Sequence, residues 1–210
     1  MKKILLFVLV SVSVTSFFLA SHYAKPLFKS TQSIPKLKDG DLIFQVNPSG
    51  QGKAIQLSTG SQFTHCGIIF IEDGVTYVYH AVEPVQKSTV KDFVSMGTNG
   101  EYWVKRLNRE LKAAELKEMK EYAKAQLGKH YDFLFKWNDN EMYCSEYIWK
   151  IYHNGAGVEI GNPKKLKEYS LDRPEVRTIM NKRYGNTVPW DEQMIAPGDI
   201  YASMVLKTVR

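Results

Sequence analysis

Cys144 stands where a polar loop gives way to an amphipathic helix, in the sequence YCSEYIWK at residues 143–150. The reactive form of cysteine is the thiolate, and the positive end of a helix dipole stabilises that anion. The apolar residues Tyr147, Ile148 and Ile151 follow at helical spacing and predict that a helix begins at the cysteine. We therefore expect Cys144 to be a nucleophile, with the free amides of the helix start placed to bind an oxyanion.

Two histidines are spaced so that a hairpin would bring them together. His65 directly precedes the apolar run CGIIF, which is typical of a buried strand, and His80 follows the DG turn signal at residues 73–74. If the hairpin pairs symmetrically about that turn, His80 lies opposite Gly67 and diagonally across from His65 on the same face. This geometry predicts that His65 is a general base whose tautomer is fixed by a hydrogen bond to His80.

Other roles remain open for these residues. Glu83, three residues beyond His80, is an alternative partner for orienting His65. A histidine at the start of a strand can also be purely structural, bonded to a backbone carbonyl. The assignment of a base therefore depends on whether the fold brings the ring of His65 to within about 3–4 Å of the Cys144 sulfur.

The second cysteine, Cys66, raises the alternative of a disulfide with Cys144. An even number of cysteines in an exported protein favours such a bond. Neighbouring residues of a strand point to opposite faces, so we expect Cys66 to face away from Cys144 if His65 faces it. On this argument both cysteines stay free.

A zinc site is a further alternative for the cysteine and the two histidines. Their positions, 65, 80 and 144, lack the closely spaced ligand pairs of protein zinc sites. The sequence also lacks a glycine-rich phosphate loop, because the GAG at residues 155–157 is better explained as a helix stop. We therefore predict neither a metal site nor a cofactor.

The elements that must position these residues follow from hydrophobic periodicity and turn signals. They predict one α+β domain over residues 37–210, with a small antiparallel sheet packed against the Cys144 helix. A long helix is expected from Arg109, capped by Asn108 and ended by Gly128, with residues 129–142 as the loop before the nucleophile. The expected strands are 42–46, 66–71, 75–82 and 101–107, with a short helix at 53–59, an irregular stretch at 158–190 and a last strand region at 194–204.

The first residues of the chain differ from the rest. Two lysines precede an uncharged apolar run from Ile4 to Ala20, which is typical of a secretory signal or an N-terminal anchor at residues 1–21. Residues 22–36 are polar, contain two prolines and predict a tether. We therefore expect an exported protein, periplasmic or extracellular, with membrane anchoring through the apolar segment as the alternative to cleavage.

Composition narrows the range of partners. The formal net charge is +6, from 28 basic and 22 acidic residues. The sequence has no arginine-rich stripe interleaved with aromatic residues, which argues against nucleic acid as a partner. The modest positive charge favours a weak attraction to anionic lipid or to cell-wall polymer.

Six short motifs in a fixed order resemble a known family. They are GDLIF at 40–44, FTHCGI at 63–68, HAVEPV at 80–85, GKHYDF at 128–133, YCSEY at 143–147 and PGDIY at 197–201. Together they span nearly the whole domain and resemble the YiiX/YebB-like group, circularly permuted papain-like relatives of the NlpC-type cell-wall peptidases. The resemblance implies a permuted papain-like fold.

The resemblance also implies roles for individual residues. Cys144 would be the nucleophile and His65 the general base. The third polar residue of the group is often glutamate, whereas His80 holds that position here, which is a departure from the pattern. Without chemistry, the same cleft would serve as a peptide- or lipid-binding module.

The substrate class remains the least determined property. The resemblance implies hydrolysis of an amide bond in a cell-wall-type peptide or of an ester bond, with a lipid acyl hydrolase or acyltransferase as the alternative, and the export signal favours the peptide. Aromatic residues near the expected site, namely Phe63, Tyr131 and Tyr143, are candidates for contact with substrate, although aromatic residues are more often part of a core. Tyr131 lies in the loop that leads to the nucleophile, where a wall of the cleft is expected.

Overall fold

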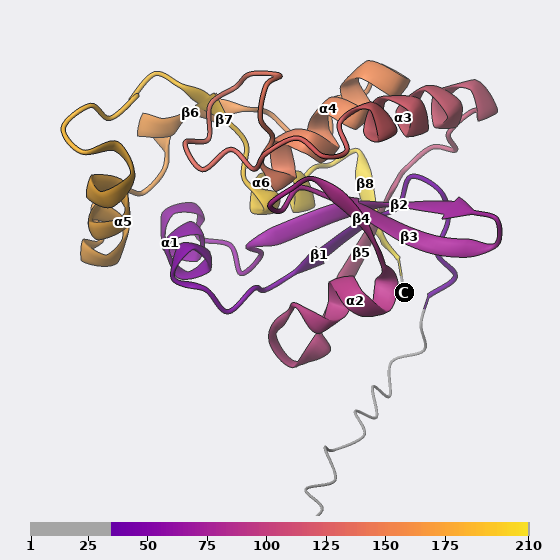
Figure 1. Ribbon diagram of the computed structural model, residues 1–210, viewed down its shortest axis with the longest axis horizontal. Helices are drawn as coiled ribbons and strands as arrows, with labels where there is room; N and C mark the ends of the chain where they lie inside the picture. The colour runs from indigo at the N-terminus through magenta and orange to yellow at the C-terminus, as the bar shows by residue number, and fades with distance from the viewer. Residues whose placement is uncertain (1–34, 210) are drawn as a thin grey trace, which may run out of the picture. The chain divides into compact units, whose positions relative to one another are not determined.

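A six-stranded antiparallel sheet forms the centre of the computed structural model, which describes residues 35–209 (Figure 1). The order of its strands is β4-β3-β2-β1-β5-β8. With the helices around it, this sheet makes the fold α+β, as the sequence predicted. The strands are β1 (Leu42–Gln45), β2 (His65–Glu72), β3 (Val75–His80), β4 (Gln86–Thr89), β5 (Trp103–Leu107) and β8 (Leu206–Val209).

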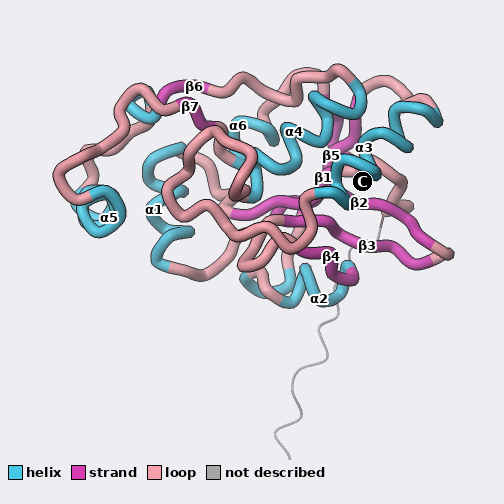
Figure 2. Tube along the Cα trace, turned by 45° about the horizontal axis from the view of Figure 1, so that its top comes forward, coloured by secondary structure: helices cyan, strands magenta, loops and turns pink. Residues whose placement is uncertain are grey.

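Helices cover both faces of the sheet and one of its ends. Figure 1 shows α3 and α4 on one face and α2 on the other, while α1 and α5 lie beyond the end of the sheet, near the two-stranded ladder of β6 and β7 (Figure 2). The elements are α1 (Gly50–Thr59), α2 (Val90–Ser95), α3 (Ala113–Ala125), α4 (Cys144–Ala156), α5 (Pro174–Tyr184), α6 (Pro197–Tyr201), β6 (Lys164–Lys165), β7 (Gln193–Met194) and the 3-10 turns Thr98–Gly100 and Leu166–Glu168.

Successive side chains of a strand point to opposite faces of the sheet, and this alternation produces two separate hydrophobic cores. Phe44 and Cys66 belong to the core beneath α4, and Ile43 and Ile69 belong to the core that includes Phe93 of α2. All five side chains are fully buried. Successive residues of a strand therefore face different helices, as the period of two requires.

The β2–β3 hairpin has the register that the sequence predicted. Asp73 and Gly74 form a two-residue turn with φ values of 50° and 79°, and Ile68 pairs with Tyr79. The same register places His80 across from Gly67. A side chain at Gly67 would meet the His80 Cβ at 3.2 Å, so glycine leaves the space that the histidine occupies.

The helix expected from Arg109 begins later than predicted. Asn108 is not its cap, because its side-chain amide donates to the Met204 carbonyl instead, and α3 starts at Ala113. The backbone N–H of Lys112 donates to the carboxylate of Glu115 and so completes the first turn. At the other end α3 stops at Ala125, before the expected glycine.

Two predictions for the last third of the chain were wrong. Residues 158–190, expected to be irregular, contain the helix α5, which begins at Pro174 and buries Val176 and Met180. Proline is favoured in the first turn of a helix, so it marks a start here rather than a loop. The expected strand region at 194–204 holds only the end of β7 and the helix α6, and the final strand is β8.

Shorter differences lie elsewhere in the chain. The strand β4 and the helix α2 were not predicted from the sequence; both are short, with four and six residues. Gly155 lies inside α4 rather than ending it, because a side chain there would meet Met119 of α3 at 2.5 Å, and Gly157 is the glycine that ends the helix.

Within residues 35–209, no helix is both long and apolar enough to cross a lipid bilayer. The expected signal or anchor at residues 1–21 lies outside the described residues, as does most of the expected tether.

Candidate active site

Cys144 is the first residue of α4, as predicted. The first hydrogen bond within this helix runs from the Tyr147 amide to the Tyr143 carbonyl at 3.0 Å. The amides of residues 144–146 therefore have no partner within the helix, and they point along its positive end. The Cys144 side chain is buried, so this electrostatic field acts on the sulfur with little screening by water.

The buried face of α4 holds the nucleophile in place. Tyr147, Ile148, Ile151 and Tyr152 are all fully buried, and the other residues from 144 to 152 are buried too, so burial extends around α4 rather than along the one face that the spacing predicted. The Tyr147 hydroxyl donates to the Ala123 carbonyl of α3 at 2.8 Å. Apolar burial and this hydrogen bond together fix the rotation of α4 against its neighbours.

His65 and His80 lie against each other, as the hairpin register predicted. Nε2 of His65 is 3.0 Å from Nδ1 of His80, and Nε2 of His80 is 2.9 Å from the Ser88 hydroxyl on β4. Both rings also pack on Phe93 of α2, with ring centroids 5.4 Å and 5.2 Å apart. The histidine pair is thus held by hydrogen bonds on one side and by an aromatic ring on the other.

The charge state of His80 determines the direction of these hydrogen bonds. Burial, helped by the neighbouring His65, lowers the pKa of His80 to about 3, so its ring is neutral near pH 7. A neutral His80 that donates from Nε2 to Ser88 accepts at Nδ1 from the Nε2–H of His65. This arrangement leaves Nδ1 of His65 as the nitrogen free to take a proton from a thiol.

The thiol of Cys144 contacts both Cys66 and His65. Hydrogen bonding to Cys66, and next to His65, lowers the pKa of Cys144 well below its usual range, although burial acts in the opposite direction. Burial and the hydrogen bond to Cys144 raise the pKa of Cys66. The two cysteines are therefore distinct: Cys144 is the more acidic thiol, and Cys66 is the one that holds its proton more tightly.

This contact corrects the expectation that Cys66 faces away from Cys144. Cys66 lies on the α4 face of the sheet, whereas the ring of His65 packs on Phe93 from the α2 face. His65 is the first residue of β2, and at the end of a strand its ring can also contact residues beyond the edge of the sheet. Both residues consequently reach Cys144, and both cysteines are free thiols.

Glu83, the alternative partner of His65, has a different position. One of its carboxylate oxygens lies 2.8 Å from Nδ1 of His130, and the other accepts from the Tyr131 amide at 2.8 Å. The Tyr131 amide, and next His130, lower the pKa of Glu83. Glu83 therefore positions the loop that precedes the nucleophile, while His80 contacts His65.

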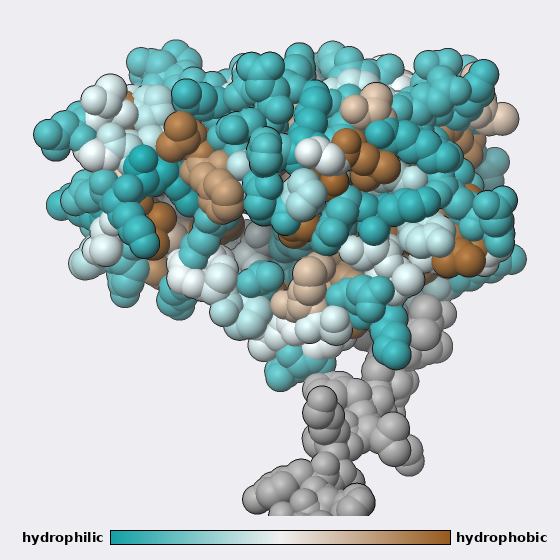
Figure 3. Space-filling model, viewed as in Figure 1, coloured by the Kyte–Doolittle hydropathy of each residue, from teal (hydrophilic) through white to brown (hydrophobic). Residues whose placement is uncertain are grey.

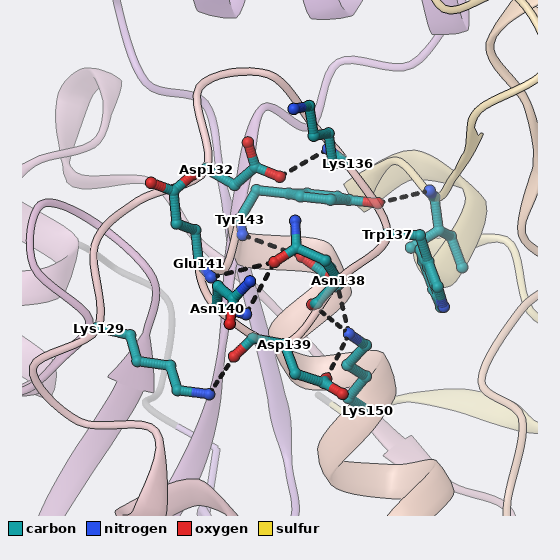
Figure 4. A network of polar contacts seen from close by, with 12 residues as sticks. Lys129, Asp132, Lys136, Trp137, Asn138, Asp139, Asn140, Glu141, Tyr143 and Lys150 are labelled. Atoms are coloured by element: carbon teal, nitrogen blue, oxygen red, sulfur yellow. Dashed lines mark hydrogen bonds and ion pairs between the residues drawn. The ribbon is translucent and has the colours of Figure 1, made fainter.

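The loop at residues 129–142 is held by a network of polar contacts (Figure 4). The Asp132 carboxylate accepts from the amides of Leu134 and Lys136 at 2.7 and 2.6 Å. From α4, the Lys150 ammonium donates to the Asn138 carbonyl at 2.6 Å. These contacts bind the loop to itself and to the nucleophile helix, so its side chains are held in place beside Cys144.

A buried acid lies in the first turn of α4, two residues after Cys144. Glu146 is fully buried, with one oxygen 2.8 Å from the Lys150 ammonium and the other accepting from the Tyr143 amide at 3.3 Å. Burial raises its pKa to about 7, and Lys150 opposes this rise. Sequence reasoning missed this residue, because an acid in the first turn of a helix is ordinarily an exposed partner of the dipole.

Two hollows meet at the site. A polar hollow of about 300 Å³ includes His65, Thr64 and Glu83, and a smaller apolar pocket of about 60 Å³ includes Cys144. Gln51, Ile55 and Tyr131 line both hollows. Cys144 and His65 therefore open onto spaces of different chemical character.

The three aromatic residues expected at the substrate site have different positions. Tyr131 lines both hollows, and Tyr143 lines the apolar pocket while its hydroxyl accepts from the Ile195 amide at 3.2 Å. Phe63 lines neither hollow. Its ring packs in the core against Tyr201 and Trp103, with centroid distances of 4.0 and 5.2 Å, so it contributes to stability rather than to substrate contact.

Comparisons with known proteins agree with this fold. A family model described as "Permuted papain-like amidase enzyme, YaeF/YiiX, C92 family" matches residues 36–210. The uncharacterized protein YiiX of Escherichia coli K12 is 39% identical over 170 residues, which cover 81% of this chain and 84% of YiiX. A crystal structure titled as that of the metalloprotein YiiX from Escherichia coli O157:H7 has a TM-score of 0.80 and 38% identity, covering 82% of this chain and 96% of that chain.

Proposed function

The chain belongs to the family of permuted papain-like amidases of YaeF and YiiX, and from this premise we propose that it hydrolyses an amide or ester through an acyl-enzyme on Cys144. One observation carries the proposal. The Cys144 thiol lies at the start of α4, in contact with His65, and its pKa is lowered. A thiolate next to an oriented imidazole is the arrangement that activates a cysteine nucleophile.

The proposed reaction has two halves. In the first, His65 takes the proton of the Cys144 thiol, the sulfur forms a bond with the carbonyl carbon, the bond from carbon to the leaving amine or alcohol breaks, and His65 passes that proton to the leaving group. In the second, a water molecule gives a proton to His65 and attacks the thioester, which releases the acid and restores the thiol. His80 keeps Nδ1 of His65 directed at the reacting atoms by accepting its Nε2–H.

Two donors are placed to stabilise the oxyanion. The first is the Cys144 backbone N–H, which has no partner within α4. The second is the Tyr131 hydroxyl, whose oxygen accepts from Nε2 of Gln51 at 3.3 Å and whose own proton stays available. Burial, and next the charge on Cys144, raises the pKa of Tyr131, so the hydroxyl keeps that proton across the working pH range.

A resident metal ion does not fit these residues, although the related YiiX crystal structure is titled as a metalloprotein. Within residues 35–209, no three side chains of His, Cys, Asp or Glu gather in a set that could hold a metal ion. Nε2 of His65 and both ring nitrogens of His80 already have hydrogen-bond partners. The proposed reaction therefore has no step through a metal.

The proposal is tested by alkylation and by mass spectrometry of the intact protein. We expect iodoacetamide to modify Cys144 far faster than Cys66, and to do so at pH 6, where a cysteine of ordinary pKa near 8.5 is almost entirely protonated. Incubation with an activated ester should add one acyl group to wild type and none to Cys144→Ala. Slow modification of both thiols, with no acyl adduct, would favour a binding module instead.

A further inference from the structure

Cys66 and Cys144 form a pair of thiols where α4 packs on β2. Their side chains share a hydrogen bond, and both are free thiols within one hydrophobic core. Figure 3 shows hydrophilic side chains over most of the visible face, with apolar ones in small groups, so this core is covered on that side. The proposed hydrolysis needs the thiol of Cys144, an imidazole and oxyanion donors, and it makes no bond to the second thiol.

Packing alone does not call for sulfur at position 66. Cys66 pairs with Phe44 of β1, and its neighbours on the same face of the sheet, Phe44 and Ile68, are fully buried apolar side chains. A free cysteine in a core packs like any small apolar side chain, so its chemistry rather than its volume distinguishes it. That chemistry is directed here at one atom, the sulfur of Cys144.

The two thiols differ in their access to solvent. Cys144 is 3% exposed and lines the apolar pocket, whereas Cys66 is fully buried and lines neither hollow of the site. A small oxidant such as hydrogen peroxide, which is little larger than water, therefore meets Cys144 first. The pKa of Cys144 is also the lower of the two, and the thiolate is the form that oxidants attack.

From this arrangement we propose that Cys144 and Cys66 form a reversible disulfide that stops hydrolysis. Cys144 is the site of oxidation by a hydroperoxide, and Cys66 is the thiol that resolves the oxidised form. The effect on hydrolysis rests on the proposed function, whereas the formation of the disulfide does not.

The oxidation of the pair has two steps. In the first, His65 takes the proton of the Cys144 thiol, the sulfur bonds to one oxygen of hydrogen peroxide and the O–O bond breaks. The departing hydroxide takes that proton from His65 and leaves as water, and Cys144 becomes a sulfenic acid. In the second, the sulfur of Cys66 attacks the sulfenic sulfur, the S–O bond breaks, and the hydroxyl leaves with the proton of Cys66 as a second water. The two thiols have then given two electrons to the peroxide, and an external dithiol returns them by exchange.

The disulfide has two consequences for Cys144. Its sulfur can no longer form an acyl-enzyme, because it has no free thiolate. It is also protected from further oxidation to sulfinic and sulfonic acid, which a dithiol does not reverse. The bond joins two elements, β2 and α4, that already pack against each other.

Mass spectrometry of the full chain, reduced and then treated with hydrogen peroxide, tests the proposal. Wild type should lose the mass of two hydrogen atoms and, once unfolded without reductant, should not react with iodoacetamide. A tryptic digest should contain one cross-linked pair of peptides, which carry Cys66 and Cys144, and dithiothreitol should separate them. Sulfinic or sulfonic acid on Cys144 of wild type, with Cys66 still free, would overturn the proposal, and so would a disulfide between two chains.

Cys66→Ser is the decisive variant, because serine keeps a hydrogen-bond donor of similar size and cannot form the disulfide. Its Cys144 should proceed to sulfinic and sulfonic acid, and dithiothreitol should not reverse this. Cys66→Ala should behave in the same way, which guards against a serine variant that does not fold. Recovery of both variants with dithiothreitol, to the extent seen in wild type, would overturn the role of Cys66.

Cys144→Ser is the matched control for the order of oxidation. Its Cys66 is fully buried in the wild-type fold and should stay reduced under the treatment that oxidises wild type. Oxidation of Cys66 in this control as fast as the disulfide forms in wild type would contradict Cys144 as the first site.

Hydrolysis of p-nitrophenyl acetate separates this proposal from the proposed function. Reduced wild type should hydrolyse the ester, peroxide should remove nearly all of this activity, and dithiothreitol should restore it. A disulfide that leaves the rate unchanged would overturn its effect on hydrolysis. Hydrolysis through Cys144 with no disulfide after peroxide would overturn the pair and leave the proposed function intact. A disulfide in a protein that hydrolyses no ester when reduced would support the pair and overturn the proposed function.

Discussion

His80 holds the position beside His65 where a carboxylate would carry a negative charge. With its pKa near 3, it offers a neutral nitrogen instead, so it orients His65 without stabilising the imidazolium electrostatically. The low pKa of Cys144 therefore depends on Cys66, on His65 itself and on the start of α4.

Replacing His80 should show whether it acts by orienting the ring of His65 or by an electrostatic effect on its charge. His80→Asn keeps a neutral acceptor and should lower kcat by no more than about tenfold, whereas His80→Leu should lower it about a hundredfold, the lower end of the range for acid–base catalysis. Because no charge is removed, the pH profile of kcat/KM should keep its shape in His80→Asn. Equal losses in both variants would mean that His80 acts only by packing.

Cys66 should tune the acidity of the nucleophile. Cys66→Ala removes the first of the hydrogen bonds that lower the pKa of Cys144, so the midpoint of its alkylation rate against pH should move upward. Cys66→Ser keeps a donor of similar size and is the control, with a smaller displacement. If wild type and Cys66→Ala have the same midpoint, the helix start and His65 alone are enough to lower the pKa of Cys144.

At the scale of elements, turn signals and hydrophobic spacing in the sequence predicted the hairpin and the helix that short-range interactions form. The DG turn fixed the β2–β3 register and thus the contact of His65 with His80, and the apolar spacing after Cys144 identified α4. Contacts between distant segments were not accessible in this way. The position of Cys66 against Cys144 depends on where α4 crosses the end of β2, and α5 is stabilised by packing on α1 that its charged sequence does not announce.

Gly67 lies across the hairpin from His80, so a substitution there tests both the packing of the hairpin and the position of His80. In Gly67→Ala the new methyl would lie 2.5 Å from a Val78 methyl and 3.0 Å from the Tyr79 carbonyl oxygen. We expect a loss of about 1–3 kcal/mol in the free energy of unfolding and a displaced His80 with lower activity. Gly50→Ala, where a side chain meets no atom within 4 Å, is the control. Thermal denaturation of the two variants at equal midpoints would contradict the close packing.

At the scale of the whole molecule, Glu146 couples global stability to pH. Its pKa is about 7 in the folded chain and near 4.5 in the unfolded chain, so the folded state binds the proton more tightly. The stabilisation is complete below pH 4.5 and is lost as pH rises to about 7, with a magnitude of about 3 kcal/mol.

Glu146→Gln should remove this dependence, because an amide resembles the protonated acid at every pH. Relative to wild type, the variant should be more stable at pH 8 and similar at pH 4.5, as measured by urea denaturation at both values. Lys150 keeps its contacts with Asn138 and Asp139 in the variant, so it is not left unpaired. A constant difference between the two proteins across this range would contradict a Glu146 that ionises within the fold.

The hydrogen bonds of Ile195 to Tyr143 and Ser145 also have a consequence for the nascent chain during synthesis, because they join residues that are added at different times. The ribosome adds Ile195 about 50 residues after Cys144, which at 5–20 residues per second corresponds to roughly 3–10 s. During that interval Tyr143 and Ser145 lack the hydrogen-bond partners that Ile195 provides in the complete fold. The candidate site around Cys144 therefore stays incomplete until residue 195 of the 210 has been added.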